Sequence, residues 1–258
     1  MQPGTRYTIR MKDEQVIIQE LLAGQDTYQP SAQTKRLLAE KTLIMLVGAT
    51  CMGKSTVMYE VMHQDKQIQV VGTRTTRSPR RDDDPNRYTY RPQTFEGLTA
   101  ISGDIQRRAI VQYVVNPHSK TIYWSESADY PGRYCIGDYF SGVVALFKAY
   151  GFENIIPITI VTNPASWQQR LDQRFPVGDP RRRERLAEAV VSLKWSLSQP
   201  SNHPFIVNLD AESQMAAASV VSVIRSKNAD YSLARKTTQQ CLDQAKALYR
   251  QLTPTDVL

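Results

Sequence analysis

The stretch that decides the fold is TLIMLVGATCMGKSTVMYEVMHQ, residues 42–64. Residues 42–47 form a short apolar run, as expected of a parallel strand that is buried on both faces. Residues 54–64 predict a helix, and Gly48 and Gly53 bound the loop between the two elements. A strand, a glycine-bounded loop and a helix in succession are typical of the start of an α/β unit.

The loop GATCMGKS, residues 48–55, matches the pattern G-x-x-x-x-G-K-S/T without a mismatch. Such a loop wraps polyphosphate with its backbone N–H groups, and a side chain at either glycine would obstruct that approach. Lys54 then supplies a positive charge, and Ser55 offers a hydroxyl as a metal ligand. The pattern predicts ATP and Mg²⁺ as cofactors, with Ser55 on the metal and a nucleotide site made of Gly48, Ala49, Thr50, Cys51, Met52, Gly53, Lys54, Ser55 and Thr56. The alternative is a chance match in a structural glycine turn, but the position between strand and helix favours a phosphate loop.

The rest of the chain alternates between the two element types. Further strands are expected at residues 68–73, 109–115, 121–125, 133–138, 155–162 and 204–209, and helices at 141–150, 164–174, 180–197 and 212–226. This predicts an α/β fold of the P-loop NTPase type, with a mostly parallel sheet flanked by helices. Residues 1–41 predict a helical N-terminal extension and 227–258 a helical C-terminal one, around a main domain at 42–226. Residues 73–92 are too polar and interrupted for a core, which indicates surface chemistry.

Composition narrows the class of protein. The net charge of +7 over 258 residues indicates an anionic partner. Three scattered cysteines fit neither a disulfide framework nor a clustered metal site. No leader-like or membrane-spanning apolar stretch is recognisable, so we expect a soluble cytoplasmic protein with no membrane partner.

The arginines gather in two segments, which predicts two faces of one phosphate-binding cleft. One segment holds Arg74, Arg77, Arg80, Arg81, Arg87 and Arg91, and the other holds Arg170, Arg174, Arg181, Arg182, Arg183 and Arg185.

The first of these segments, TRTTRSPRRDDDPNRYTY at residues 73–90, resembles the guanylate kinase signature. That signature is a T-T-R-x-P-R run followed by an acidic, glycine-containing turn and a tyrosine. The resemblance implies that Arg77, Arg80 and Tyr88 hold the phosphate of an acceptor nucleotide and that Thr73 helps to contact its base. The interval to Tyr88 is one residue shorter than the family pattern, and DDDP replaces the glycine-bearing turn. A solvated basic loop or a nucleic-acid patch is the alternative for this segment.

Two further motifs follow in the family's order, so that the resemblance covers residues 42–226. RLDQRFPVGDPRRRERLAEA, residues 170–189, keeps the spacing of the guanylate kinase lid, with Arg170, Arg174 and Arg185 at its arginine positions. An exposed helix with basic decoration is the alternative for this segment. PFIVNLD resembles the family's last strand and implies that Asn208 lies near the adenine of ATP. The resemblance thus implies a monophosphate-binding insert at 73–130, a helical lid at 166–190, and the catalytic residues Lys54, Arg77, Arg170, Arg174 and Arg185.

The base-binding positions depart from the family. Gln112 stands where a carboxylate accepts two hydrogen bonds from guanine, and a glutamine cannot accept both. Tyr123 and Ser125 align with a Y-G-T/S element in which Trp124 replaces the glycine, and Asp138 aligns with one aspartate of a downstream acidic element, near the base or, through water, near Mg²⁺. Ordinary packing is an equal alternative for Gln112 and Trp124.

Taken together, these residues predict ATP-dependent phosphorylation of a nucleoside monophosphate, with GMP or dGMP as the first candidate. A different or modified deoxynucleotide is the alternative acceptor, and a binding module without turnover is the alternative protein. We expect small nucleotides as partners and a monomer or homodimer. A nucleic-acid-dependent NTPase, suggested by the positive charge, is the less favoured interpretation.

Overall fold

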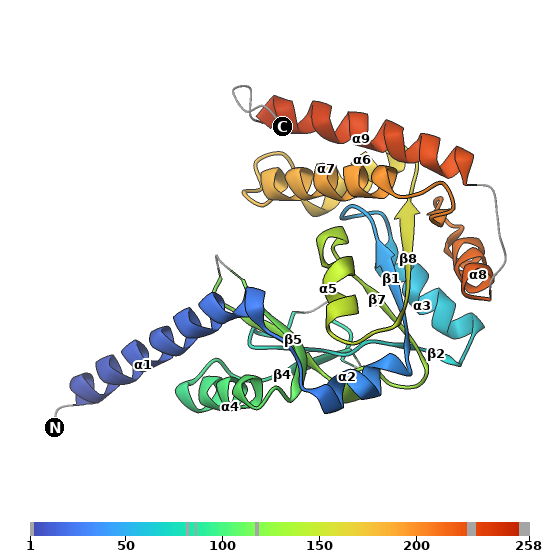
Figure 1. Cartoon of the computed structure of the whole chain (residues 1–258). Helices are drawn as coiled ribbons and strands as arrows, with labels where there is room; N and C mark the ends of the chain where they lie inside the picture. Colours follow the sequence, from blue (N-terminus) through green and yellow to red (C-terminus); the bar gives the residue numbers. More distant parts are fainter. Residues whose placement is uncertain (1–2, 81–82, 86, 117–118, 226–230, 253–258) are drawn as a thin grey trace. The chain divides into compact units, whose positions relative to one another are not determined.

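The computed structural model describes residues 3–80, 83–85, 87–116, 119–225 and 231–252 (Figure 1). Arg81 of the first arginine segment lies outside these residues. The chain forms two compact units. Unit 1 comprises Met1–Lys41, Val71–Pro131 and Lys148–Glu153, and unit 2 comprises Thr42–Val70, Gly132–Phe147 and Asn154–Leu258.

Unit 2 is built on a five-stranded sheet in which every pair of neighbouring strands is parallel. In spatial order its strands are β2 (Ile68–Val70), β7 (Tyr134–Asp138), β1 (Thr42–Val47), β8 (Asn154–Val161) and β9 (Phe205–Val207). Strands β2 and β7 lie on one side of β1, and β8 and β9 lie on its other side, so the order in which the chain adds strands changes direction at β1. Parallel sheets bind ligands outside the carboxyl ends of the strands at such a change of direction, which here is the end of β1.

Two apolar clusters hold the helices of unit 2 around this sheet. Helices α3 (Lys54–Gln64) and α8 (Ser213–Ile224) lie side by side (Figure 1) and pack on Ile44, Leu46 and Ile160. The second cluster joins α6 (Pro164–Arg174), α7 (Arg182–Ser198) and α9 (Ser232–Leu252), and it includes Ala49 and Met52 of the glycine loop. Helix α9 lies along α7 (Figure 1), and its buried face supplies Cys241, Leu242, Ala245 and Tyr249.

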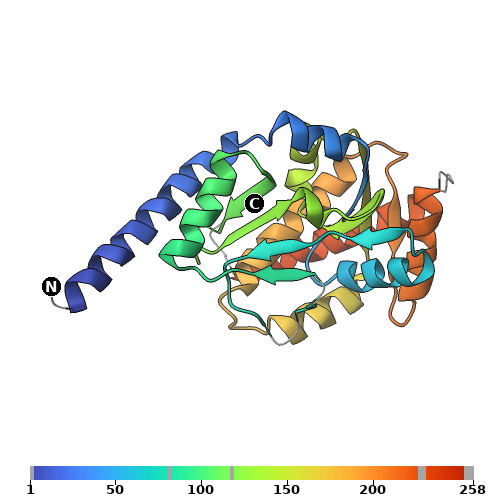
Figure 2. The same ribbon diagram turned by 90° about the horizontal axis from the view of Figure 1, so that it is seen from below.

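Unit 1 contains a four-stranded mixed sheet in the order β4 (Tyr88–Tyr90), β3 (Thr73–Thr75), β6 (Ile122–Glu126) and β5 (Ile110–Val115). Strand β3 pairs in parallel with β4 and antiparallel with β6, which is antiparallel to β5. Helix α1 (Pro3–Gly24) lies beside α4 (Phe95–Gln106) (Figure 2), and both contribute to a core under β5 and β6. Short helices η1 (Gln25–Thr27), α2 (Ala32–Ala39) and η2 (Ser127–Asp129) also belong to this unit, whereas η3 (Ser141–Val143) lies in unit 2 and α5 (Val144–Ala149) follows it.

The predicted fold class is confirmed: a parallel sheet flanked by helices is accompanied by a small second sheet. Among the residues described, none of the helices has the length and apolar character that crossing a bilayer requires. One prediction is wrong in part. Residues 73–92 were expected to lie outside any core, but 73–75 form β3 and 88–90 form β4, and Thr75, Thr76 and Arg77 are buried. Burial of Arg77 is tolerated because an acidic partner, described below, neutralises its charge.

Candidate functional site

The glycine loop, residues 48–53, joins the carboxyl end of β1 to the start of α3. Gly48, Cys51 and Gly53 all have positive φ angles, of 136°, 65° and 82°. A Cβ at Gly48 would lie 2.4 Å from the backbone oxygen of Ile160, and a Cβ at Gly53 would lie 2.2 Å from Nδ2 of Asn208. Both glycines are therefore required by the space around them as well as by the backbone conformation. The loop ends at the N-terminus of an 11-residue helix, where backbone N–H groups and the helix dipole favour an anion.

Neighbouring elements fix this loop in place. The indole Nε1 of Trp167 donates a 2.9 Å hydrogen bond to the carbonyl of Thr50, and Nδ2 of Asn208 donates one of 3.1 Å to the carbonyl of Met52. Asn208 is only 3% exposed, and its Oδ1 is buried without a hydrogen-bond partner in the described structure. Its amide nitrogen thus holds the loop, and the adenine contact expected from the sequence stays a prediction.

Lys54 lies within the curve of the loop. Its Nζ donates hydrogen bonds of 2.8 Å to the carbonyl of Gly48 and 2.9 Å to that of Ala49. Burial lowers the pKa of its ammonium, and the negative charges of Asp138 and Glu188 partly offset this effect. A partly buried cation held by neutral carbonyls is well suited to an incoming anion, because reduced solvent exposure strengthens the attraction between charges.

Two side-chain oxygens meet beside the helix start, one from helix α3 and one from the end of strand β7. Oγ of Ser55 donates a 3.4 Å hydrogen bond to Oδ2 of Asp138, which is the last residue of β7. No cluster of three or more His, Cys, Asp or Glu side chains fit to hold a metal occurs among the described residues. One hydroxyl and one carboxylate fit Mg²⁺, since this ion usually takes one or two protein ligands and completes its shell with phosphate oxygens and water. The structure therefore places Asp138 with the glycine loop in unit 2, whereas the other predicted substrate contacts are in unit 1.

A cavity of about 490 Å³ opens at this edge of the sheet. Its lining combines loop, helix and strand-end residues, namely Thr50, Cys51, Gly53, Lys54, Ser55, Thr56, Asp138, Arg170, Arg174, Asn208, Leu209, Ala211 and Ser213. The structure thus brings together most of the predicted nucleotide residues and two of the three predicted lid arginines.

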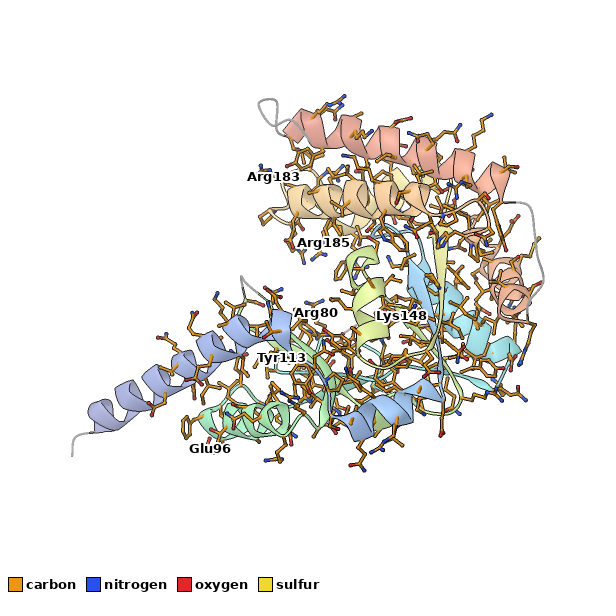
Figure 3. The ribbon with its side chains drawn as sticks, viewed as in Figure 1. Arg80, Glu96, Tyr113, Lys148, Arg183 and Arg185 are labelled. Atoms are coloured by element: carbon orange, nitrogen blue, oxygen red, sulfur yellow. The ribbon has the colours of Figure 1, made fainter. Side chains whose placement is uncertain are left out.

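Each of the three predicted lid arginines has a nearby partner. Arg170 forms an ion pair with Asp210, which also accepts a hydrogen bond from Ser166. The guanidinium of Arg174 lies 5.7 Å from the ring centre of Phe175. Arg185 pairs with Glu188 at 2.7 Å, on the side of α7 that faces away from α9, whereas Arg183 extends toward α9 (Figure 3). Arg185 does not line the cavity.

Unit 1 holds a second constellation, around Arg77. Both terminal nitrogens of its guanidinium donate 2.6 Å hydrogen bonds to the two carboxylate oxygens of Asp83. The same carboxylate accepts a 2.5 Å bond from the hydroxyl of Tyr90 and a 2.6 Å bond from the backbone N–H of Arg80, whose own side chain is exposed (Figure 3). The ring of Tyr88 stacks on the guanidinium at 4.8 Å. Tyr90 therefore donates its hydroxyl to the Asp83 carboxylate, whereas the ring of Tyr88 covers the Arg77 guanidinium.

Sequence reasoning missed both Tyr90 and Asp83. A signal for Tyr90 was present, because the spacing from Arg80 to Tyr88 is short by the family pattern and a second tyrosine follows two residues later. Two residues apart on β4, the two rings lie on one face of the strand and stack at 6.1 Å.

The predicted base contacts share one face of the small sheet. Ser125 pairs in register with Gln112 across β5 and β6, and Nε2 of Gln112 donates a 3.4 Å bond to its hydroxyl. Tyr123 lies two residues before Ser125 and pairs with Thr75 of β3, while Thr73 lies two residues before Thr75. Because side chains alternate along a strand, these residues point to the same side.

Trp124 points to the other side, where it is 1% exposed and packs with α1 and α4. Packing therefore accounts for Trp124, and it leaves the opposite face of β6 to Tyr123 and Ser125. Ser125 is itself buried and shares a 2.9 Å hydrogen bond with the hydroxyl of Tyr130.

Comparison with known proteins gives a likeness in structure only. No protein-family model matches the sequence, and no curated protein matches it. Among solved structures, the chain is similar to guanylate kinase from Anaplasma phagocytophilum, with a TM-score of 0.45 and 15% sequence identity over 85% of this chain and 100% of that one.

Proposed function

We propose that this chain is an ATP-dependent nucleoside monophosphate kinase. The observation that carries the proposal is the glycine loop at the end of β1, in which Gly48 and Gly53 leave no room for a side chain and Lys54 opens the following helix. A loop of this shape serves polyphosphate, because its backbone donors must approach the anion closely.

In this proposal unit 2 binds ATP. Lys54 supplies positive charge to the phosphates, and Ser55 and Asp138 hold Mg²⁺, which when bound would neutralise further charge on the phosphate oxygens. Arg170 and Arg174, which line the same cavity, add charge where negative charge grows during transfer, and Arg185 acts with them from the start of α7. Asn208 keeps the loop in its binding shape through the carbonyl of Met52.

Unit 1 binds the acceptor. Arg77, with the hydroxyl of Tyr90 and the N–H of Arg80, holds the acceptor phosphate, and the face that carries Thr73, Gln112 and Tyr123 receives the base. An acceptor phosphate oxygen attacks the γ-phosphorus of ATP, and the bond to the leaving ADP oxygen breaks. Positioning and charge stabilisation suffice for this reaction, and no covalent enzyme intermediate is needed.

GMP or dGMP is the first candidate for the acceptor. Gln112 is the reason to consider other bases as well, because its amide presents one donor and one acceptor where guanine offers two donors. A binding module that has lost turnover is the second candidate function, and Gln112 is the feature that favours it.

ADP release with a panel of acceptors tests the proposal. GMP, dGMP, AMP, CMP, UMP and modified deoxynucleotides would be offered to the wild type, to Lys54→Ala and to Lys194→Ala, an exposed lysine of α7 that serves as the matched control. We expect acceptor-dependent release from the wild type and the control, and a loss of about 10²-fold or more in Lys54→Ala, as for removal of one charge-stabilising donor. No acceptor-dependent release from the wild type, or full activity of Lys54→Ala, would overturn the proposal.

A further inference from the structure

The Arg77 constellation already contains an anion of its own. The carboxylate of Asp83 accepts two hydrogen bonds from the guanidinium, one from the hydroxyl of Tyr90 and one from the backbone N–H of Arg80, all between 2.5 and 2.6 Å. The side chains of Arg77 and Asp83 are 8% and 11% exposed. The pair is thus largely withdrawn from water, where charge-assisted hydrogen bonds are strong.

These donors are also the ones that a phosphate monoester requires. A guanidinium fork, a phenolic hydroxyl and a backbone N–H recur as phosphate contacts, and the guanidinium binds two oxygens of a phosphate as readily as two of a carboxylate. The carboxylate oxygens of Asp83 therefore stand in for two oxygens of a phosphate. Only one anion fits on the fork at a time, because both terminal nitrogens of Arg77 are engaged.

Asp83 is also bound to the backbone of Arg80. Its backbone N–H donates a 3.2 Å bond to the carbonyl of Arg80, while the N–H of Arg80 binds the Asp83 carboxylate. Asp83 lies between β3 and β4, in the DDDP stretch that replaces the family's glycine-bearing turn. Asp83 thus belongs to neither strand, and its carboxylate can leave the guanidinium without breaking the pairing of β3 with β4.

From this geometry we infer that Asp83 is an internal competitor for the acceptor phosphate and sets the affinity of the site. The inference rests on the proposed function only in identifying the ligand as a nucleoside monophosphate. When a binding-competent state is populated only in part, the apparent affinity falls by that fraction. A phosphate dianion carries twice the charge of the carboxylate, so it displaces Asp83 at a lower concentration than an anion with a single carboxylate does.

The test is equilibrium binding of methyl phosphate, which has the phosphate but no base or sugar, to the full chain by calorimetry. Asp83→Asn removes the competing charge and keeps the shape of the side chain, and Asp84→Asn makes the same change one residue away. We expect Asp83→Asn to bind methyl phosphate at least about tenfold more tightly than the wild type, as for loss of a charged hydrogen-bonded partner, and Asp84→Asn to stay within about twofold of it. The gain should vanish in the Arg77→Met/Asp83→Asn double variant, and ATP affinity should not change in any of them. Equal or weaker methyl phosphate binding by Asp83→Asn would overturn the inference.

A measurement on the wild type decides the matter if Asp83→Asn fails to fold. Carbodiimide labelling of Asp83, read by peptide mass spectrometry, should rise when methyl phosphate saturates the protein, because the carboxylate is then exposed. Unchanged labelling at saturation would refute the competition. Neither result depends on phosphoryl transfer, so failure of the kinase assay and failure of this inference are separate outcomes.

Discussion

Substitution of Gly48 by alanine should lower the free energy of unfolding of unit 2. Two costs contribute, one from the backbone conformation and one from steric overlap. The φ angle of 136° costs a residue with a Cβ about 1–3 kcal/mol. Overlap of that Cβ with the backbone oxygen of Ile160, 2.4 Å away, adds about 1–3 kcal/mol, because β8 is paired on both sides and its backbone cannot withdraw. The expected total is about 2–6 kcal/mol.

Two other glycines separate these costs. Gly178 has a φ of 96°, and a Cβ at this residue would meet no atom within 4 Å, so Gly178→Ala should show the conformational cost alone. Gly142 has neither a positive φ nor a close neighbour, and Gly142→Ala should be neutral or stabilising by up to about 1 kcal/mol.

Urea unfolding followed by circular dichroism measures all three variants against the wild type. The free energy of unfolding of Gly48→Ala should be about 1–3 kcal/mol lower than that of Gly178→Ala, which is the cost of the steric overlap. Equal losses in these two variants would show that the loop does not press against β8, and the close approach on which the phosphate site depends would be refuted.

Two further predictions concern titration and reactivity. Burial lowers the pKa of His203 to about 4. As pH falls from about 6.5 toward 4, the unfolded chain therefore binds a proton that the folded chain does not, and the free energy of unfolding should fall by up to about 1.4 kcal/mol per pH unit. Unfolding measured at several pH values should lose this slope in His203→Gln and keep it in His63→Gln, an exposed histidine, and an unchanged slope in His203→Gln would contradict the assignment. Iodoacetamide should modify Cys51, which lines the cavity, faster than Cys241, which is buried and whose thiol pKa burial raises to about 12. ATP should slow the reaction of Cys51. Mass spectrometry of the labelled peptides measures both effects, and faster labelling of Cys241 would contradict the described packing of α9.

The sequence predicted best those elements whose pattern is local. Strand β1, the glycine loop and helix α3 were expected within residues 42–64 and occupy those residues, and helix α6 begins and ends where its periodicity placed it. Each has a strong start signal or an uninterrupted apolar pattern, so tertiary contacts did not need to be known.

Helix α4 was not predicted, although its signals are present in retrospect. Thr94 caps its N-terminus by accepting a hydrogen bond from the N–H of Gly97, and Leu98, Ile101 and Ile105 fall on one face. Gly97 and Gly103 within the helix weaken its propensity, and packing against α1 compensates.

The contacts around Arg77 could not be predicted from the sequence, because they depend on which of several neighbouring aspartates pairs with its guanidinium. Three consecutive aspartates follow the arginines, and no local rule selects Asp83 as the one that turns back onto the guanidinium. The same holds for Trp124, whose side of β6 is decided by the pairing register and by the cover that α1 and α4 provide.

The most direct test of the proposed reaction uses ATP with a radioactive γ-phosphate. Each monophosphate is offered in turn under single-turnover conditions, and the product that carries the radioactive phosphate is identified. The proposal predicts that the label appears in the corresponding nucleoside diphosphate for at least one acceptor, and that it appears there about 10²-fold more slowly or less in Lys54→Ala. Label released only as inorganic phosphate, or label that stays in ATP with every acceptor, would contradict it.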